Sequence, residues 1–385
     1  MPGWRAQLYE SQGAIAGIDP AIIQNALKAA NAILARNPDL TPVLTLRHLA
    51  SMVDVDYSIL RGIASRSIQD PYRTFRIRKR SPAKGKKRFR VICVPSPVLL
   101  LTQRWISENI LSKISAHPSS VAYSKGNRLV DAAKPHCGAK WVIKLDVLNF
   151  FESITEIAVY RVFRGQGYQP LVSIELARIC TRAGNTTALR STARWRSFGQ
   201  ERGIKDYAQR YMGHLPQGAP TSPMLSNLVC TDFDNQVQAI ATHNGLTYTR
   251  YADDIALSSK SDEFSREIAA HVIGQVYEVM GRFGLSPNAT KAQVIPPGGR
   301  KVVLGLLVDG SAPRLPRDFK AILRRHLYYL TNPTTGPSGH AKARQFASII
   351  GMRNHIGGLL AFARQIEPVY ATKCEALFKS VKWPI

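Results

Sequence analysis

Two adjacent aspartates, Asp253 and Asp254, stand between β-prone runs and could act together on a metal ion. The run TYTR precedes Tyr251-Ala252, and the run IALSS follows the pair. Adjacent residues of a regular strand face opposite sides, so the two carboxylates converge only at a tight hairpin turn. Repulsion between close carboxylates is relieved by protonation or by cations, and hard oxygen ligands suit Mg²⁺. The alternative is a solvated Asp-Asp turn, which is the commoner role of such a pair in isolation.

A third aspartate, Asp146, has a matching setting at the end of the run WVIKLD, residues 141–146. A lone aspartate at a strand end usually caps a helix. Together with Asp253 and Asp254, however, it predicts three carboxylates on two adjacent strands. Such a site can hold two Mg²⁺ ions on the attacking and leaving oxygens of an in-line phosphoryl displacement. The residues therefore predict a two-metal nucleotidyl transferase.

The elements that position these aspartates follow from the hydrophobic pattern. Residues 141–146 are predicted to form a buried strand running into a helix, residues 246–259 a hairpin, and residues 222–241 one long helix. This mixture of strands and helices indicates layers of sheet and helix. Residues 183–212 show little periodicity and are interpreted as a basic surface insertion.

The N-terminal 70 residues are predicted to be helical. Asp19 can cap a helix that begins at Pro20. The apolar residues of this helix recur at helical spacing, at Ile22, Ile23, Ala26, Leu27, Ala30, Ile33 and Leu34.

A basic β-hairpin is predicted next, within residues 71–95, with a Pro/Gly/Lys loop between its strands. Residues 71–90 hold ten Lys/Arg and no acid. Like charges at this density repel unless phosphates neutralise them, so a nucleic-acid or nucleotide contact is favoured over a solvated basic loop.

The chain after Pro313 is again helical and carries 12 Lys/Arg against 3 Asp/Glu. The run RDFKAILRRHLYYL, residues 317–330, has an apolar stripe predicted to be core and an opposite stripe of cations with an aromatic, which is typical of a nucleic-acid track. The apolar stripe is Phe319, Ile322, Leu323, Leu327 and Leu330, and the opposite stripe is Arg317, Lys320, Arg324 and Tyr328.

The composition of the whole chain favours a polyanionic partner. Its 52 Lys+Arg against 26 Asp+Glu give a formal charge of +26 over 385 residues. Nucleic acid is the leading candidate, and a basic ribosome-like or membrane-surface protein is the alternative. The five cysteines form no CxxC pair, which argues against disulfides and a zinc site. Neither a membrane span nor a signal-peptide core is seen, so a cytoplasmic protein without a membrane partner is expected.

Several sequence motifs occur along the chain in the same order as in a known protein family. The segments are KLDVLNFFESI, LPQGAPTSPMLSNLVCTDFD, YTRYADDIALSS, LSPNATK and VVLGLLV. Over about residues 45–380 the chain resembles bacterial reverse transcriptases. LPQGAPTSP, RYADD and RLVDAAKPH are most similar to blocks of the retron group. Two blocks depart from that group, since the chain has Ala132-Ala133-Lys134-Pro135-His136 in place of Asn-Ala-x-x-His and Val303-Leu304-Gly305 in place of Val-Thr-Gly.

The resemblance implies an α+β right-hand polymerase fold with fingers, a palm of antiparallel sheet plus helices, and a helical thumb. The expected parts are an N-terminal helical region at 1–70, fingers and palm at 71–310, and a thumb at 311–385. It also implies RNA-templated DNA synthesis with two Mg²⁺ ions and Asp146, Asp253 and Asp254 as catalytic residues. The expected metal ligands are Asp146, Val147, Asp253 and Asp254.

The resemblance also implies a set of nucleotide-binding residues. Phe151 would stack under the sugar and block a 2′-hydroxyl, although both Phe150 and Phe151 could instead be core. Gln217 and Gly218 would line the incoming nucleotide, with a plain helix-capping loop as the alternative. Lys79 and Arg90 would contact phosphates. Lys291 could protonate the departing pyrophosphate, although most such lysines are surface residues.

The expected RNA-binding residues lie in the two altered blocks and in the thumb. His136 has an alternative as a surface histidine beside a helix end. The full set is His136, Gly305, Arg317, Lys320, Arg324, Arg325 and Tyr328.

A retron enzyme would bind a cognate structured noncoding RNA, use dNTPs and keep the RNA-linked DNA product. It would act in antiphage defence with an effector or toxin protein. Two other hypotheses are a different defence-associated or group II intron-like reverse transcriptase, and a catalytically idle RNA-binding scaffold. The presence of all three aspartates argues against the scaffold.

Overall fold

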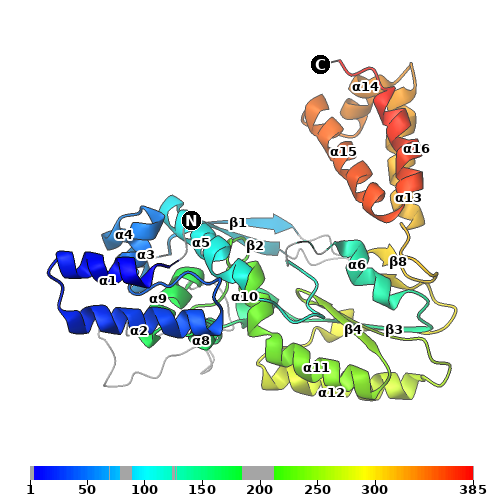
Figure 1. Cartoon of the computed structure of the whole chain (residues 1–385). Coiled ribbons are helices and arrows are strands. Elements are labelled where there is room, and N and C mark those ends of the chain that lie inside the picture. Colours follow the sequence, from blue (N-terminus) through cyan, green and yellow to red (C-terminus); the bar gives the residue numbers. More distant parts are fainter. Residues whose placement is uncertain are drawn as a thin grey trace.

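The computed structural model describes residues 4–68, 70–78, 89–123, 126, 128–183 and 212–384. It shows an α+β sheet body, formed by the described residues up to 308, and a C-terminal helical unit, residues 317–379, that projects from it (Figure 1). The predicted α+β class is confirmed, because every ladder between the named strands is antiparallel. No helix among these residues has the length and apolar character needed to cross a membrane.

The described residues before the first strand form four helices, in line with the helical character predicted for this region. Asp19 caps the second of them, since its Oδ1 accepts from the Ala21 N–H at 2.7 Å. The predicted helix is confirmed, but its apolar residues differ in burial, since Ile23 is buried and Ile22 is 61% exposed. The early part of this helix packs mainly on the helix before it, which leaves its outer face in solvent. The helices are α1 (Ala6–Ile15), α2 (Pro20–Arg36), α3 (Leu46–Val53) and α4 (Tyr57–Ala64).

The basic hairpin is confirmed in its described strands. β1 (Tyr72–Arg78) and β2 (Phe89–Pro95) pair antiparallel, from Tyr72 opposite Pro95 to Arg78 opposite Phe89. Its base is buried and its outer part is exposed. The segment that follows contains α5 (Pro97–Asn109), η1 (Leu111–Lys113), α6 (Leu129–Ala133) and η2 (Lys134–His136).

The main sheet has the strand order β4-β5-β3-β6. Its strands are β3 (Trp141–Asp146), β4 (Thr247–Tyr251), β5 (Asp254–Ser259) and β6 (Gln293–Ile295). One face carries Ile143, Leu145, Ile255 and Leu257 into the large core cluster with α11 (Thr231–His243) and α12 (Arg266–Arg282).

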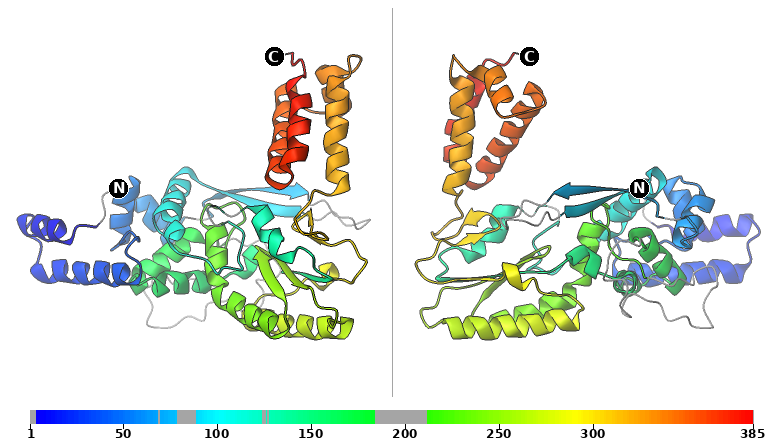
Figure 2. Two further views of the ribbon diagram at one scale, coloured as in Figure 1. Left: turned by 45° about the vertical axis from the view of Figure 1, so that its right-hand side comes forward. Right: turned by 180° about the vertical axis from the view of Figure 1, so that it is seen from behind.

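Alternate strand residues face opposite ways, so Asp146 and Asp254 point to the side away from α11 and α12. The β1–β2 hairpin and the C-terminal helical unit lie on that same side of the body (Figure 2).

The predicted helix over residues 222–241 is broken into two. Cys230 lies between α10 (Ser222–Val229) and α11, and its ψ of 8° interrupts the helix there. Cys230 is buried at this joint, and the change of direction lets α11 pack along α12. The helices between β3 and this pair are α7 (Phe150–Ser153), α8 (Glu156–Gly165) and α9 (Pro170–Cys180). The predicted insertion at 183–212 lies almost wholly outside the described residues.

Leu323, Leu327 and Met352 of the C-terminal helical unit belong to a second apolar cluster, which also includes Val142 and Ala256 of the main sheet. Phe319 is only partly buried against Phe362, and Ile322 is 46% exposed, so the predicted core stripe was wrong at Ile322. The unit consists of α13 (Arg317–Thr331), α14 (Gly336–Ala343), α15 (Ile349–Ile366) and α16 (Pro368–Lys379). The last elements of the sheet body before it are η6 (Ala289–Lys291), β7 (Val302–Val303) and β8 (Leu306–Leu307).

Candidate active site

The three predicted aspartates come together at one end of the main sheet. Asp146 ends β3 and pairs with Asp254, the first residue of β5. Asp253 lies in the two-residue turn between β4 and β5, where Ala252 has a left-handed φ of 54°. The Val147 N–H donates to the Asp253 carbonyl at 3.0 Å, which ties the turn to β3. The tight hairpin turn and the adjacent strands are therefore as predicted.

The carboxylates lie in an environment that disfavours unpaired negative charge. Burial, with the charge of Asp146 adding to it, raises the pKa of Asp253. Burial also raises the pKa of Asp254, and the charges of Asp253 and Asp146 raise it further. A cation among the three would relieve both effects, so the donor set fits hard divalent ions.

Asp146 is engaged by two protein groups from the LSPNATK segment. Its Oδ1 accepts from Asn288 Nδ2 at 2.7 Å, and its Oδ2 accepts from Lys291 Nζ at 2.6 Å. Consistent with this, no three His, Cys, Asp or Glu side chains of the described chain already stand in a metal-coordinating cluster. Lys291 occupies the position of a counter-cation beside Asp146. A metal ion on Asp146 Oδ2 would compete with this ammonium group for the carboxylate.

Val147 can contribute to such a site only through its main chain. Its side chain is 2% exposed, and its N–H is used by Asp253.

The Gln217-Gly218 loop is fixed against the basic hairpin. The Cys93 N–H of β2 donates to the Gln217 carbonyl at 2.7 Å, and Gln217 Nε2 lies 3.2 Å from Glu152 Oε1. Gly218 has a φ of 111°, and a Cβ there would lie 2.9 Å from the Cys93 carbonyl oxygen. Only glycine suits this close approach and backbone conformation.

The two phenylalanines after β3 have different environments. Phe150 is 3% exposed and is core, as predicted for one of the pair. Phe151 is half-buried, with its ring 5.6 Å from that of Phe150 in an edge-on arrangement. Its partial exposure, five residues after Asp146 in the chain, is compatible with the predicted contact to a sugar.

The predicted phosphate contacts are described only in part. Arg90 is exposed on β2, opposite Ile77. Its charge, with that of Lys291, acts against the burial that raises the pKa of Asp253. The charge of Arg90 therefore acts on Asp253. Lys79 lies outside the described residues.

His136 is deep inside the molecule. Its side chain is 0% exposed, so the alternative of a surface histidine was wrong. Nδ1 lies 2.7 Å from Ser258 Oγ and Nε2 lies 2.7 Å from Thr249 Oγ1. Burial lowers the pKa of His136 to about 4. With both nitrogens engaged, the side chain has no group left for RNA, which corrects the expected direct contact. His136 instead braces the β4–β5 hairpin.

The other predicted RNA-binding residues lie on the surface near or in the C-terminal helical unit. Gly305, with a φ of 79°, forms the β7–β8 turn together with Leu304. Lys320 is partly buried in an ion pair with Glu367 at 2.6 Å. The exposed members are Arg317, Arg324, Arg325 and Tyr328.

A basic hollow lies at the start of α13. It has a volume of about 440 Å³ and is lined chiefly by cations. Its charged lining residues are Arg300, Asp309, Arg314, Arg317 and Lys320.

Several residues that shape the site were missed by sequence reasoning. Asn288 donates a hydrogen bond to Asp146, and Glu152 accepts one from Gln217. Arg250 forms a fully buried ion pair with Asp234. The only sequence signal for that pair is a cation in the β-prone run TYTRY and an acid within an otherwise apolar helical face.

Comparison with known proteins shows the family of the chain. The reverse transcriptase (RNA-dependent DNA polymerase) family profile matches residues 77–306. Retron Ec86 reverse transcriptase of Escherichia coli is 31% identical over 259 residues, which cover 67% of this chain and 70% of that protein. Retron Mx162 reverse transcriptase of Myxococcus xanthus is 30% identical over 358 residues, covering 89% and 70%. Retron Ec83 reverse transcriptase of Escherichia coli is 25% identical, covering 81% and 89%. The chain therefore belongs to the reverse transcriptase family, is of the retron type, and is an RNA-directed DNA polymerase.

Proposed function

We propose that Asp146, Asp253 and Asp254 form the two-metal centre of this reverse transcriptase, and that its product is RNA-linked DNA copied from one cognate RNA. The observation that carries the first part is the pairing of Asp146 with Asp254 across adjacent strands, with Asp253 in the turn beside them. Bound Mg²⁺ would supply Lewis acidity at the primer hydroxyl and neutralise charge on the leaving pyrophosphate. The Val147 carbonyl is a further candidate ligand.

Lys291 is proposed to change partner during the reaction. Its ammonium group donates a hydrogen bond to Asp146 Oδ2, and a metal ion bound at this carboxylate would release the lysine side chain. The side chain is 57% exposed, so it has room to turn toward the leaving pyrophosphate and donate a proton there. Asn288 would keep Asp146 oriented through Oδ1 throughout.

The incoming nucleotide is proposed to lie between the basic hairpin and the Gln217 loop. The contact of that loop with Cys93 supports this, because it joins the loop to the strand that carries Arg90. Arg90 and Lys79 would hold the triphosphate, Gln217 would hydrogen-bond the nucleotide, and Phe151 would exclude a 2′-hydroxyl.

The C-terminal helical unit is proposed to act as the thumb, with residues 1–70 as an N-terminal helical region and 71–310 as fingers and palm. Its exposed cations on α13 continue into the basic hollow beside Arg314, which suits a sugar-phosphate backbone. Lys320 contributes less, because Glu367 already neutralises it.

The retron product, the antiphage role and an effector partner are proposed from the relatives, which are named retron reverse transcriptases. A large cationic surface can hold one structured RNA as template, primer and stable ligand at once, which defines where synthesis starts and stops.

The test is to express the protein with its native upstream region and to extract the nucleic acid that copurifies. We expect one short DNA species, still joined to RNA, whose gel mobility after RNase treatment shifts on debranching. Asp253→Asn serves as the matched control, because it should retain the RNA and yield no DNA. Heterogeneous DNA copied from many cellular RNAs, or a band that never shifts on debranching, would contradict the retron product while leaving the metal centre in place.

A further inference from the structure

The turn that carries Asp253 has an unusual support on the α11 side of the sheet. Arg250 of β4 and Asp234 of α11 form an ion pair in which both side chains are 0% exposed. Arg250 Nε donates to Asp234 Oδ1 at 2.7 Å and Nη2 donates to Oδ2 at 2.6 Å. The Tyr248 hydroxyl donates to the same Oδ1 at 2.6 Å. The Asp234 carboxylate thus accepts three hydrogen bonds, two from Arg250 and one from Tyr248.

The remaining guanidinium donors reach other segments. Nη1 donates to the Ala252 carbonyl at 3.2 Å, and Nη2 also donates to Ser120 Oγ at 3.0 Å. The Arg250 main chain exchanges hydrogen bonds with the segment around Ser120, through Ser119 and Val121. One side chain therefore joins α11, the 119–121 segment and the β4–β5 turn.

The contact with Ala252 matters because of which peptide it holds. The Ala252 carbonyl belongs to the peptide unit that contains the Asp253 nitrogen, so fixing it fixes the direction in which Asp253 leaves the turn. Ala252 has a left-handed φ of 54°, a conformation that costs an alanine energy and needs outside support. On its other side, the Asp253 carbonyl is held by the Val147 N–H at 3.0 Å. Asp253 is thus fixed from both peptides.

We propose that the Arg250–Asp234 pair is a positioning device for the metal centre, which sets Asp253 at the distance from Asp146 that divalent ions require. Arg250 touches neither substrate nor metal and acts through the Ala252 peptide. The inference rests on the proposed two-metal function of the aspartates. The same guanidinium also lies 5.8 Å from the Phe150 ring, which links the turn to the segment carrying Phe151.

The alternative is that the pair only neutralises two buried charges. Arg250→Lys separates the two roles, because lysine keeps the charge opposite Asp234 but is a single point donor that cannot span the carboxylate and the turn together. A merely structural pair would then retain metal affinity and turnover, whereas a positioning pair would lose both.

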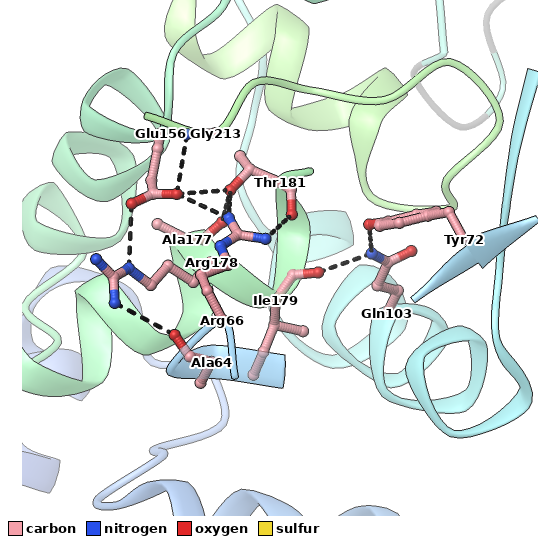
Figure 3. Close-up of polar contacts among 10 residues, drawn as sticks. All are labelled: Ala64, Arg66, Tyr72, Gln103, Glu156, Ala177, Arg178, Ile179, Thr181 and Gly213. Atoms are coloured by element: carbon pink, nitrogen blue, oxygen red, sulfur yellow. Dashed lines mark hydrogen bonds and ion pairs between the residues drawn. The ribbon is translucent and has the colours of Figure 1, made fainter. Parts of the chain in front are cut away.

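The chain offers a matched control in a second buried ion network (Figure 3). Arg66 donates to Glu156 Oε2 at 2.7 Å and to the Thr181 carbonyl at 2.8 Å, so it also joins a buried carboxylate to a main-chain oxygen. Arg66→Lys should therefore cost similar folding stability without touching the β4–β5 turn.

The experiment compares the full-length wild type, Arg250→Lys and Arg66→Lys. Mn²⁺ is the metal probe, and its binding to the enzyme without nucleotide is followed by electron paramagnetic resonance. Primer extension with Mg²⁺ supplies kcat and the KM for dNTP, and thermal melting supplies stability. For Arg250→Lys we expect weaker Mn²⁺ binding and a kcat about 10- to 100-fold lower, with little change in the KM. For Arg66→Lys we expect wild-type Mn²⁺ affinity.

Wild-type Mn²⁺ affinity and kcat in Arg250→Lys would overturn the proposal, as would equal losses in Arg66→Lys. If Arg250→Lys does not fold, Tyr248→Phe takes its place, since it loosens Asp234 without removing a charge. It should lower Mn²⁺ affinity and kcat in the same direction, and unchanged values would again refute the proposal. Failure of the metal centre itself is distinguishable, because Asp253→Asn would then bind Mn²⁺ as the wild type does.

Discussion

Acid should lower the folding stability of this protein through His136, which is a buried histidine. Its ring is 0% exposed and bridges Ser258 and Thr249 on the β4–β5 hairpin. A protonated ring would have to place a second N–H donor, and a charge, in this buried position. We therefore expect native His136 to stay neutral and the protein to lose stability as the pH falls.

The size of the effect follows from the pKa. Burial lowers the pKa of His136 from 6.5 to about 4, so between these values the unfolded chain binds more protons than the native one. The stabilisation is fully present above pH 6.5 and is lost as the pH falls toward 4. The linkage relation gives a loss of about 2 kcal/mol between pH 8 and pH 5 from this group alone.

The assay compares the free energy of unfolding of wild type and His136→Gln at pH 8 and pH 5. Glutamine keeps a donor and an acceptor but does not titrate, so the wild type should lose about 2 kcal/mol more than the variant over this range. Burial lowers the pKa of His326 in the C-terminal helical unit to about 4 as well, but its contribution is common to both proteins and cancels. Equal losses in the two proteins would refute the reasoning, as would an NMR titration of His136 near its ordinary pKa.

Three further predictions concern the reaction itself. Asp253→Asn should lower primer extension with Mg²⁺ by about a hundredfold or more while leaving RNA binding nearly intact, and wild-type extension rates would end the two-metal assignment. Phe151→Ala should raise ribonucleotide incorporation relative to dNTP by about tenfold or more, whereas an unchanged preference would return Phe151 to the core. Replacing Arg324 and Arg325 with Gln should weaken template affinity and reduce the salt slope of log K by about 1.5, and identical slopes would exclude them from the nucleic-acid track.

The geometry of the three aspartates was largely predictable because it depends on local rules. Strand alternation and a two-residue turn bring Asp253 beside Asp254, and the buried run before Asp146 brings the third carboxylate to the neighbouring strand. The basic hairpin and the helical C-terminus followed from pattern and composition in the same way. Their side chains interact with near neighbours or with solvent, so the sequence contains most of the information.

Burial in three dimensions was not predictable to the same degree. Ile22 and Ile322 lie on apolar faces of α2 and α13. The elements that pack on these helices cover only part of each face, so both side chains remain exposed. His136 was predicted to contact RNA, with a surface histidine as the alternative, because its burial depends on strands more than 100 positions away. Periodicity cannot report which distant element covers a given face.

By itself, the sequence determined the family and the α+β class, and it predicted that Asp146, Asp253 and Asp254 lie together, because motif order and residue type are local properties. Only the tertiary structure decided how the aspartates are supported. Lys291 and Asn288 on Asp146, and the Arg250–Asp234 pair behind the turn, are contacts between segments far apart in the chain. These contacts form only because α11, η6 and the main sheet pack together. The spacing of hydrophobic residues along one segment does not predict that packing.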